Sequence, residues 1–464
     1  MPSVVQVRRP YWNTEIESKL NTPEMKDIQW AKLKKKLEYF YEATPFWRSR
    51  MERAGIEPGD VRTWDDFHKR IPVFTKDQYR EYAEECQGDI SRMLDGFMGE
   101  DAKRLVCLAA TSGTTGEPAP YPFTAEDRQA WAEFFARQLW RGGVFPGDKV
   151  LHGFGLSMFI GGTVLCMAMS DYGACCIPLG AEAGMEAIVR CAKLFKPKAL
   201  VCTPSLAEYM IEKAPEVIGA SVGSLGIERL LCGGEPGAGI PEVRQKIESA
   251  FGAKLFDIGG GGCSCEAPGY QGLHFLNEDI MLFELVHPET HEHVPLEDGA
   301  TGLLVFTQLP GTMGWSGLRQ TPNDIVQVFT SPCSCGGTGF RFRIIGRGDD
   351  MLKVKGVMVY PPAVEGVINA FVPRVTGEFR IVLNTPPPRV VPPLILKVEH
   401  GEGLSEEQLR DLEGEIAEAM HRRIKVRPRI LWVSPNTLGR FLKKKNLFER
   451  TYEKTRQRQM EEKP

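Results

Sequence analysis

Short apolar runs alternate with helical patterns between about residues 100 and 235 of this chain. The runs "ALVCT" and "RLLCGG" are separated by "PSLAEYMIEKA", and "GMEAIVRCAKLF" precedes the first of them. Because a helix after each strand returns the chain to the same edge of the sheet, this alternation predicts an α/β domain with a largely parallel sheet. From about residue 280 the runs shorten into strand, turn and strand, which predicts an antiparallel, strand-rich subdomain over 280–345.

The domain organisation follows from a Gly/Asp-rich stretch, "GRGDD", that separates two β-like runs. We expect a large N-terminal domain over 1–345, a hinge at 346–350 and a small α+β C-terminal domain over 351–464, which is long enough to fold alone. Near the N-terminus, apolar positions recur at the helical period over 25–55, and Pro45 divides them into two expected helices.

The composition narrows the classes of partner. With 57 Lys and Arg against 60 Asp and Glu the formal charge is −3, so no bulk field recruits nucleic acid or an anionic membrane. The N-terminus lacks the apolar core of a signal peptide, and glycines and Asp171 interrupt the most apolar span, 151–180, so we expect neither export nor a membrane span. Twelve cysteines without a secretory signal favour the reducing cytoplasm. The expected partners are small molecules or protein surfaces, including a second copy of the chain in a homodimer.

A glycine-rich stretch, "TSGTTGEPAPYPFT", begins at residue 111. Gly113 and Gly116 allow backbone N–H groups to wrap an anion, and the hydroxyls of Ser112, Thr114 and Thr115 add neutral donors, which is the arrangement that a polyphosphate requires. The stretch lacks the Gly-Lys-Ser/Thr ending of a P-loop. On composition alone, a flexible turn remains the alternative.

Several motifs occur in the order that one family shows. They are "YWNTEIE", "ATPFWRSRMERAGIEPGDVRTWDDFHKRIPVFTK", the glycine-rich stretch, "GFGLSMFIGG", "CGGEPG" and "GRGDDMLKVKGVMVYPPAVE". Together they make nearly the whole chain resemble the phenylacetate-CoA ligase branch of the adenylate-forming enzymes. The resemblance implies that a carboxylate attacks ATP to give an acyl-adenylate and pyrophosphate, and that coenzyme A thiolate then displaces AMP. Both steps need charge stabilisation more than covalent catalysis.

The resemblance also implies nucleotide-binding residues. The β- and γ-phosphates would be held by Thr111, Ser112, Gly113, Thr114, Thr115 and Gly116, and the adenine by Gly233, Gly234, Glu235 and Pro236. Asp257 would belong to the same nucleotide site, with Mg²⁺ accompanying ATP. Asp324, in "RQTPNDIV", matches the aspartate that binds the ribose hydroxyls, which suits a carboxylate facing a diol.

Catalytic roles follow from the same resemblance. Arg347 matches the arginine near the phosphates, Arg319 is kept from a second arginine motif, and Asp349 or Asp350 matches the hinge. A C-terminal domain hinged there would present a lysine for adenylation and then rotate to admit the thiol. In "GRFLKKKN" that lysine is Lys444 or its neighbour 443, and a basic surface run is the alternative.

At two places the sequence departs from the family pattern and lacks side chains that the family uses at the nucleotide site. Where the family has Asp-Ile-Tyr-Gly-x-Thr/Ser-Glu, this chain reads "DIGGGGCSCE", so the aromatic residue that stacks on adenine, the threonine and the Mg²⁺-binding glutamate are absent in register. Glu266 is the nearby acid that remains. The second departure, "LRQTPND", loses an arginine at Thr321. These changes indicate either a retuned active site or a chain that adenylates poorly.

Four metal-ligating residues resemble the zinc-binding positions of part of this family: Cys265, His274, Cys333 and Cys335, in "CEAPGYQGLH" and "SPCSCGG". Three thiolates and an imidazole make a closed tetrahedral site, so a structural Zn²⁺ is expected to pin the strand-rich subdomain. Cys263 could replace Cys265, and free thiols are the alternative to zinc.

The acyl pocket is expected from "HGFGLSMFIGG" and "TPSLAEY", which match segments that line the acid in relatives. The candidate lining residues are Phe154, Gly155, Phe159, Pro204 and Ser205. Aromatic and small residues suit a flat aryl acid better than a long acyl chain, although core packing explains each of them as well. The leading hypothesis is an AMP-forming aryl-CoA ligase that uses ATP and coenzyme A. The alternatives are an adenylating enzyme with an amine or carrier-thiol acceptor, and a non-catalytic relative that binds a nucleotide or acyl-CoA.

Overall fold

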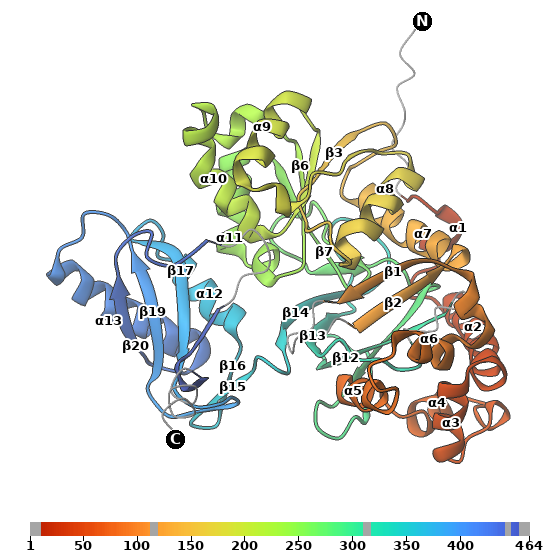
Figure 1. Cartoon of the computed structure of the whole chain (residues 1–464). Coiled ribbons are helices and arrows are strands. Elements are labelled where there is room, and N and C mark those ends of the chain that lie inside the picture. The colour runs from red at the N-terminus through yellow and green to blue at the C-terminus, as the bar shows by residue number, and fades with distance from the viewer. Residues whose placement is uncertain (1–10, 112–118, 310–316, 441–446, 454–464) are drawn as a thin grey trace, which may run out of the picture.

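A twelve-stranded sheet forms the centre of the large domain (Figure 1). The computed structural model describes residues 11–111, 119–309, 317–440 and 447–453. The parallel half of the sheet has the order β4-β3-β5-β6-β7, with β3 (Lys149–His152), β4 (Cys175–Ile177), β5 (Ala199–Cys202), β6 (Arg229–Cys232) and β7 (Lys254–Gly259). The predicted α/β fold with parallel strands is confirmed.

Helices cover both faces of this parallel half. They are α7 (Ala125–Arg141), α8 (Leu165–Tyr172), α9 (Met185–Phe195), α10 (Pro204–Ile218) and α11 (Pro241–Phe251). Side chains alternate across a strand, so Ala199 and Val201 of β5 pack with α7 and α8, whereas Leu200 and Cys202 pack with α9, α10 and α11. Because both faces are buried, β5 is apolar at every position, and its run was legible in the sequence as a strand.

The strands from residue 262 onward are antiparallel and continue the same sheet. They are β8 (Gly262–Cys263), β9 (Leu273–Phe275), β10 (Met281–Val286), β11 (His293–Val294), β12 (Thr301–Gln308), β13 (Asp324–Phe329) and β14 (Arg341–Arg347). The junction is β8, which pairs antiparallel with β7 and with β9. The strand-rich segment expected over 280–345 is therefore joined edge to edge with the parallel strands.

Helices near the N-terminus pack beside the antiparallel half of the sheet (Figure 1). They are α1 (Thr14–Glu17), α2 (Pro23–Ala43), α3 (Pro45–Arg53), α4 (Trp64–Arg70), α5 (Lys76–Glu85) and α6 (Ile90–Met98). The expected break at Pro45 is confirmed: α2 ends before Thr44, which is extended, and Pro45 opens α3. A separate antiparallel hairpin follows, with β1 (Leu105–Thr111) and β2 (Ala119–Thr124).

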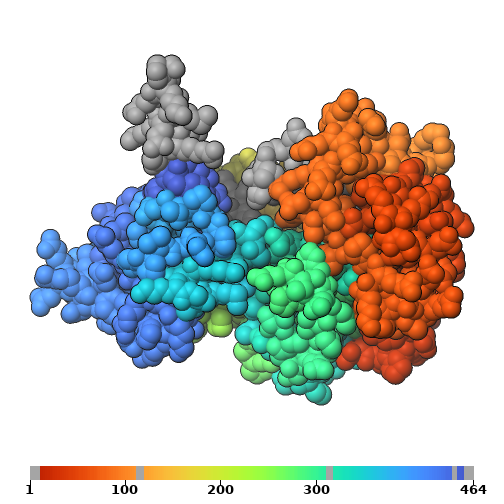
Figure 2. Space-filling model, turned by 90° about the horizontal axis from the view of Figure 1, so that it is seen from below, coloured from red at the N-terminus to blue at the C-terminus, as the bar shows by residue number. Residues whose placement is uncertain are grey.

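The C-terminal part forms a lobe of its own beside the large domain (Figure 2). Its strands are β15 (Leu352–Val354), β16 (Val357–Val359), β17 (Val375–Leu383), β18 (Arg389–Val390), β19 (Leu394–His400), β20 (Pro428–Val433) and β21 (Phe448–Arg450), and its helices are α12 (Pro361–Asn369) and α13 (Glu406–Ile424). Its buried core contains side chains of this part alone. Since β14 ends at Arg347 and β15 begins at Leu352, the connection falls at the predicted hinge. Among the described helices, none is long and apolar enough to cross a membrane.

Candidate active site

Four chain segments converge where the parallel strands end. In α/β sheets, ligands bind outside the carboxyl ends of the strands, and β3, β5, β6 and β7 end side by side. The backbone N–H of Gly153 donates to the Val201 carbonyl at 2.8 Å, and that of Gly233 donates to the Cys202 carbonyl at 3.1 Å. The pocket and adenine segments predicted from sequence therefore lie on one edge.

Close packing joins the predicted adenine segment to the predicted acid pocket. A Cβ at Gly233 would lie 2.2 Å from the carbonyl oxygen of Ile258 in β7, so only glycine fits there. The Glu235 carboxylate accepts the backbone N–H of Ser205 at 2.6 Å, in the first turn of α10. A Cβ at Gly234 would lie 4.0 Å from the Phe154 ring, so the two segments share a wall.

The pocket segment after β3 is shaped by a residue that the sequence did not reveal. The carboxylate of Glu182 accepts the backbone N–H of Leu156 at 2.9 Å, and a Cβ at Gly155 would lie 2.9 Å from the same carboxylate. Phe154 is buried, whereas Phe159 is 37% exposed. Glu182 comes from η4 (Ala181–Ala183), outside every recognised motif, so only the fold brings it here.

His152 ends β3 directly before this segment and is fully buried. One of its ring nitrogens, Nε2, lies 2.9 Å from the Gly161 carbonyl, and the other, Nδ1, has no hydrogen-bond partner. Burial lowers the pKa of His152, so its ring is neutral and Nε2 carries the proton. This hydrogen bond holds Gly161, near the end of the pocket segment, against the end of β3.

Asp257 of β7 lies opposite Cys232 of β6, next to the adenine segment. The hydroxyl of Tyr270, in the connection between β8 and β9, donates to Asp257 Oδ2 at 2.6 Å. Burial raises the pKa of Asp257 to about 6, although the Tyr270 hydrogen bond and the charge of Arg244 lower it. No sequence signal pointed to Tyr270 or Arg244.

Arg347 joins the proposed ribose aspartate to the hinge. Its guanidinium donates to both oxygens of Asp349 at 2.9 Å and to Asp324 Oδ1 at 3.3 Å. Asp350 is also near, at 3.8 Å from Nε. Burial opposes the ionisation of Asp349, but its bonds with Arg347 outweigh burial and lower the pKa of Asp349. Three residues predicted separately are therefore one charged cluster.

Arg319 lies elsewhere, and its contacts favour a structural role in place of the predicted catalytic one. Its guanidinium, 2% exposed, pairs with Glu284 of β10 at 3.1 Å. The same group donates to the carbonyls of His68 and Ile71 at 2.7 and 2.6 Å, at the C-terminal end of α4. A cation there complements the helix dipole, and no phosphate can reach an enclosed guanidinium. The catalytic role of Arg319 stays a prediction, and these contacts favour a structural one.

The predicted phosphate loop and catalytic lysine fall outside the described residues, except for Thr111. Residues 112–118 connect β1 to β2, and Lys444 lies between Arg440 and β21. The end of β1 reaches the pocket segment, since the backbone N–H of Ala110 donates to the Met158 carbonyl at 2.5 Å. The hairpin that bears the glycine-rich stretch is thus attached to the candidate pocket.

Cys265, His274, Cys333 and Cys335 bring their ligand atoms within 4.8 Å of one another. The sulfurs of Cys265 and Cys333 are 3.7 Å apart, and Cys335 Sγ lies 3.3 Å from His274 Nε2. His274 Nδ1 faces the Thr338 carbonyl at 3.2 Å, which fixes the proton on Nδ1 and leaves Nε2 as a ligand atom. The predicted set converges as a four-ligand cluster.

The positions of Cys263 and Glu266 bear on two alternatives from the sequence. Cys263, the last residue of β8, is buried outside this cluster, and the chain turns after it to present Cys265. Glu266 lies 3.4 Å from Arg229, the first residue of β6, whereas the adenine segment follows the last residue of that strand. A four-residue strand spans about 10 Å, so Glu266 is at the wrong end of the sheet to replace the missing Mg²⁺ ligand.

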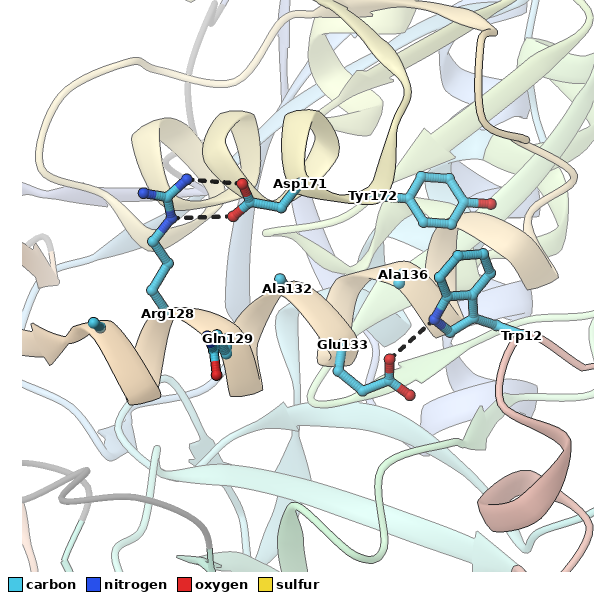
Figure 3. Close-up of a pocket in the computed structure, with 9 residues that line it drawn as sticks. Trp12, Arg128, Gln129, Ala132, Glu133, Ala136, Asp171 and Tyr172 are labelled. Atoms are coloured by element: carbon cyan, nitrogen blue, oxygen red, sulfur yellow. Dashed lines mark hydrogen bonds and ion pairs between the residues drawn. The ribbon is translucent and has the colours of Figure 1, made fainter.

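Figure 3 shows a groove that is lined by residues other than the predicted site residues. It has a volume of about 420 Å³ and lies between Trp12 and the helices α7 and α8. Arg128 and Asp171 form a two-point ion pair across it, and Trp12 Nε1 donates to Glu133 at 2.9 Å. None of the predicted site residues lines it.

Two family models match parts of the chain. The AMP-binding enzyme C-terminal domain matches residues 356–450, and the GH3 family N-terminal domain matches residues 24–160. The phenylacetate-coenzyme A ligase of Thermus thermophilus is 32% identical over 93% of this chain and 94% of its own length. That of Escherichia coli is 29% identical over 75% of this chain and 77% of its own length.

Solved structures of one ligase resemble the chain to different degrees. A crystal structure of 2-hydroxyisobutyryl-CoA ligase in the postadenylation state matches with a TM-score of 0.86 and 26% identity, covering 99% of this chain and 96% of that one. The same ligase in the thioesterification state, with 2-HIB-AMP and CoA, matches with a TM-score of 0.65 over 98% and 95%. Both structures are of the same ligase, so their TM-scores differ because the ligase has two conformations. The domain arrangement of this chain is more similar to that of the postadenylation state.

Proposed function

The chain belongs to the phenylacetate-CoA ligase family of adenylate-forming enzymes, and from that premise we propose which acid and which residues its reaction uses. The protein is an AMP-forming, ATP-dependent acid–CoA ligase. We propose an aromatic, phenylacetate-like acid as its substrate. The observation that supports the proposal is that the expected pocket and adenine segments follow strands whose carboxyl ends lie side by side, in a chain that matches a phenylacetate-CoA ligase over nearly its whole length.

In the first half-reaction, a carboxylate oxygen of the acid bonds to the α-phosphorus of ATP, and the bond to pyrophosphate breaks. Asp324 accepts hydrogen bonds from the ribose, with Arg347 beside it balancing its charge. Thr111 and residues 112–116 would bind the leaving phosphates, and Lys444 or its neighbour 443 would stabilise the developing charge. In the second half-reaction, the CoA sulfur bonds to the acyl carbon and AMP leaves, after the C-terminal domain has turned about Asp349 and Asp350.

The described residues do not offer the family's Mg²⁺ ligand. The position in register with that glutamate is Cys263 in this chain. The nearby Glu266 pairs with Arg229 at the opposite end of β6. We therefore propose that Mg²⁺ enters as part of the MgATP substrate, and no step of the reaction depends on a protein carboxylate that holds it.

The four-ligand cluster fits a structural Zn²⁺. Two thiolates on a tetrahedral zinc with bonds of about 2.3 Å would be about 3.8 Å apart, and the sulfurs of Cys265 and Cys333 are 3.7 Å apart. The other two ligands would be His274 Nε2 and Cys335. With four protein ligands the ion has no open position, so it would tie the loop before β14 to β9 without taking part in the reaction. Thiolate ligands require a reducing setting, which supports a cytoplasmic location.

The test of the function is a panel of aryl and short aliphatic acids, with pyrophosphate release measured with and without CoA. We expect acid-dependent pyrophosphate release and a CoA thioester with an arylacetic acid. Release without any thioester would favour a different acceptor. No release with any acid would favour a non-catalytic relative that binds nucleotide or acyl-CoA. Light scattering of the purified protein tests for a homodimer, and added vesicles or nucleic acid should not co-purify with it.

A further inference from the structure

Asp257 is held by Tyr270, whose ring is packed against Gly239 and lies near Arg244. Tyr270 donates to Asp257 Oδ2 at 2.6 Å, and its ring lies against Gly239, where an added Cβ would be 3.2 Å from the ring. Arg244 of α11 lies 5.9 Å from the ring centre. Its guanidinium also donates to the carbonyls of Ala238 and residue 255, so the ring is fixed from behind by a group that is itself anchored.

The other oxygen, Asp257 Oδ1, has no hydrogen-bond partner in the described part of the chain, and the Asp257 side chain is partly exposed. Nearby, the family pattern that this chain resembles places its adenine-stacking aromatic residue at position 259, and a Cβ added to Gly259 would meet nothing within 4 Å. The space beside Asp257 is therefore open on the side of the adenine segment. A single carboxylate oxygen faces that space.

We infer that Tyr270 is a positioning residue that holds the Asp257 carboxylate toward the nucleotide base and so selects a base with an amino group at position 6. This inference rests on the proposed function. An ionised Oδ1 accepts a hydrogen bond from the 6-amino group of adenine. The same oxygen faces the 6-oxo group of hypoxanthine with no hydrogen between them, which is unfavourable. With the stacking residue absent at 259, this polar contact carries more of the base recognition.

The selection depends on the protonation state of Asp257. Burial raises the pKa of Asp257 to about 6, and the hydrogen bond from Tyr270 and the charge of Arg244 keep it from rising further. The titratable and charged groups that face this pair are Arg244 from α11, Cys232 from β6, Cys263 from β8 and Arg343 from β14. The hydrogen bond with Cys202 and burial raise the pKa of Cys232, and burial raises the pKa of Cys263, so both thiols stay neutral. Below pH 6, Asp257 gains a proton and can donate to a 6-oxo group, so selection against hypoxanthine weakens.

The experiment measures binding of ATP and inosine triphosphate by calorimetry as a function of pH, without acid or CoA. The wild-type preference for ATP should fall with a midpoint near pH 6. Tyr270→Phe keeps the ring and loses the hydroxyl, so its midpoint should rise by about one to two pH units, and at pH 7 its preference should drop about tenfold. Asp257→Asn should show little preference at any pH. Tyr172→Phe, which removes a hydroxyl bonded to the Val144 carbonyl, is the matched control and should behave as wild type.

Because the measurement needs neither acid nor CoA, it separates this inference from the catalytic proposal. A protein that binds nucleotide with these shifts but activates no acid would refute the catalytic proposal alone. A Tyr270→Phe midpoint equal to that of wild type would overturn the role of the hydroxyl. Equal loss of both nucleotides in Tyr270→Leu, with Tyr270→Phe unchanged, would show that the ring itself acts and would also overturn the inference.

Discussion

Two ion pairs join the C-terminal domain to the large domain in the arrangement described here. Arg440 lies 3.0 Å from Glu212 on α10, and Arg423 lies 3.0 Å from Glu242 on α11. Arg440 also binds Glu399 of its own domain at 2.9 Å, so Glu212→Gln removes only the contact between the domains. We predict that Glu212→Gln, alone and combined with Glu242→Gln, moves the domain equilibrium away from this arrangement, which resembles the postadenylation state and in which we expect adenylation to occur.

The magnitude follows from the exposure of the pairs. The side chains of Glu212 and Arg423 are 35% and 52% exposed, so each pair is partly screened by solvent. Such pairs contribute about 0.2 to 1 kcal/mol each. Removing both changes the equilibrium by about 0.4 to 2 kcal/mol, which is a factor of about 2 to 30. The change is large enough to measure and too small to unfold either domain.

The assay separates the half-reactions. Acid-dependent pyrophosphate exchange reports adenylation and should slow by about 2-fold to 30-fold in the double variant. Thioester formation from supplied acyl-adenylate should stay the same or become faster, because the domain turns more readily. Added salt should reproduce this pattern in the wild type. Glu216→Gln, which breaks a pair with Lys213 inside α10, is the matched control. Equal losses in both half-reactions, or unchanged exchange, would refute the proposed role of these contacts in domain alternation.

Three further predictions test the fold and the cluster. Cys333→Ser should lower the zinc content from about one ion per chain and lower the melting temperature more than it lowers adenylation, as elemental analysis, calorimetry and pyrophosphate exchange would show. Gly233→Ala should weaken nucleotide binding at least tenfold while circular dichroism stays normal, because its Cβ would meet the Ile258 carbonyl at 2.2 Å; normal binding would place the adenine elsewhere. Burial lowers the pKa of His68 to about 3 and also lowers the pKa values of His291 and His293. The unfolded chain binds these protons below about pH 6.5 and the folded chain does not, so the free energy of unfolding should fall as the pH drops through 6.5; urea denaturation at pH 7.5 and 5.5 measures this fall, and His68→Gln should reduce it.

The parallel strands could be predicted from the sequence because a strand buried on both faces is a continuous run of apolar residues. Every residue of β5 is apolar, and the helices beside it keep a helical period. In a parallel sheet the carboxyl ends of the strands form one edge, which is why the segments after β3, β5 and β6 lie together in the structure. Pro45 and Gly233 are equally local signals, since a fixed φ and a missing Cβ have direct structural consequences.

The side chains that reach the site from other segments could not be predicted, because no local sequence pattern identifies them. Glu182 and Tyr270 belong to no repeated spacing, and their roles depend on which backbone groups the fold places beside them. Arg319 shows the same limit from the other side: its motif predicts a catalytic role, but in the fold Glu284 and the end of α4 bind its guanidinium. A sequence motif identifies the residue type, but the residues that bind its side chain are known only from the packed structure.

The glycines at 259–262 have a structural role that the sequence alone does not indicate. As a sequence, "DIGGGGCSCE" shows only what is missing from the family pattern. In the structure, these glycines form the tight antiparallel turn from β7 into β8, with Ile258 opposite Cys263, and the backbone N–H of Asp257 donates to Ser264 Oγ at 2.9 Å. This turn delivers Cys265 to the metal-ligand cluster, and the chain that follows brings Tyr270 back to Asp257. The glycine segment therefore lacks the aromatic residue of the family pattern, and the chain after it supplies the Tyr270 hydroxyl that orients the Asp257 carboxylate.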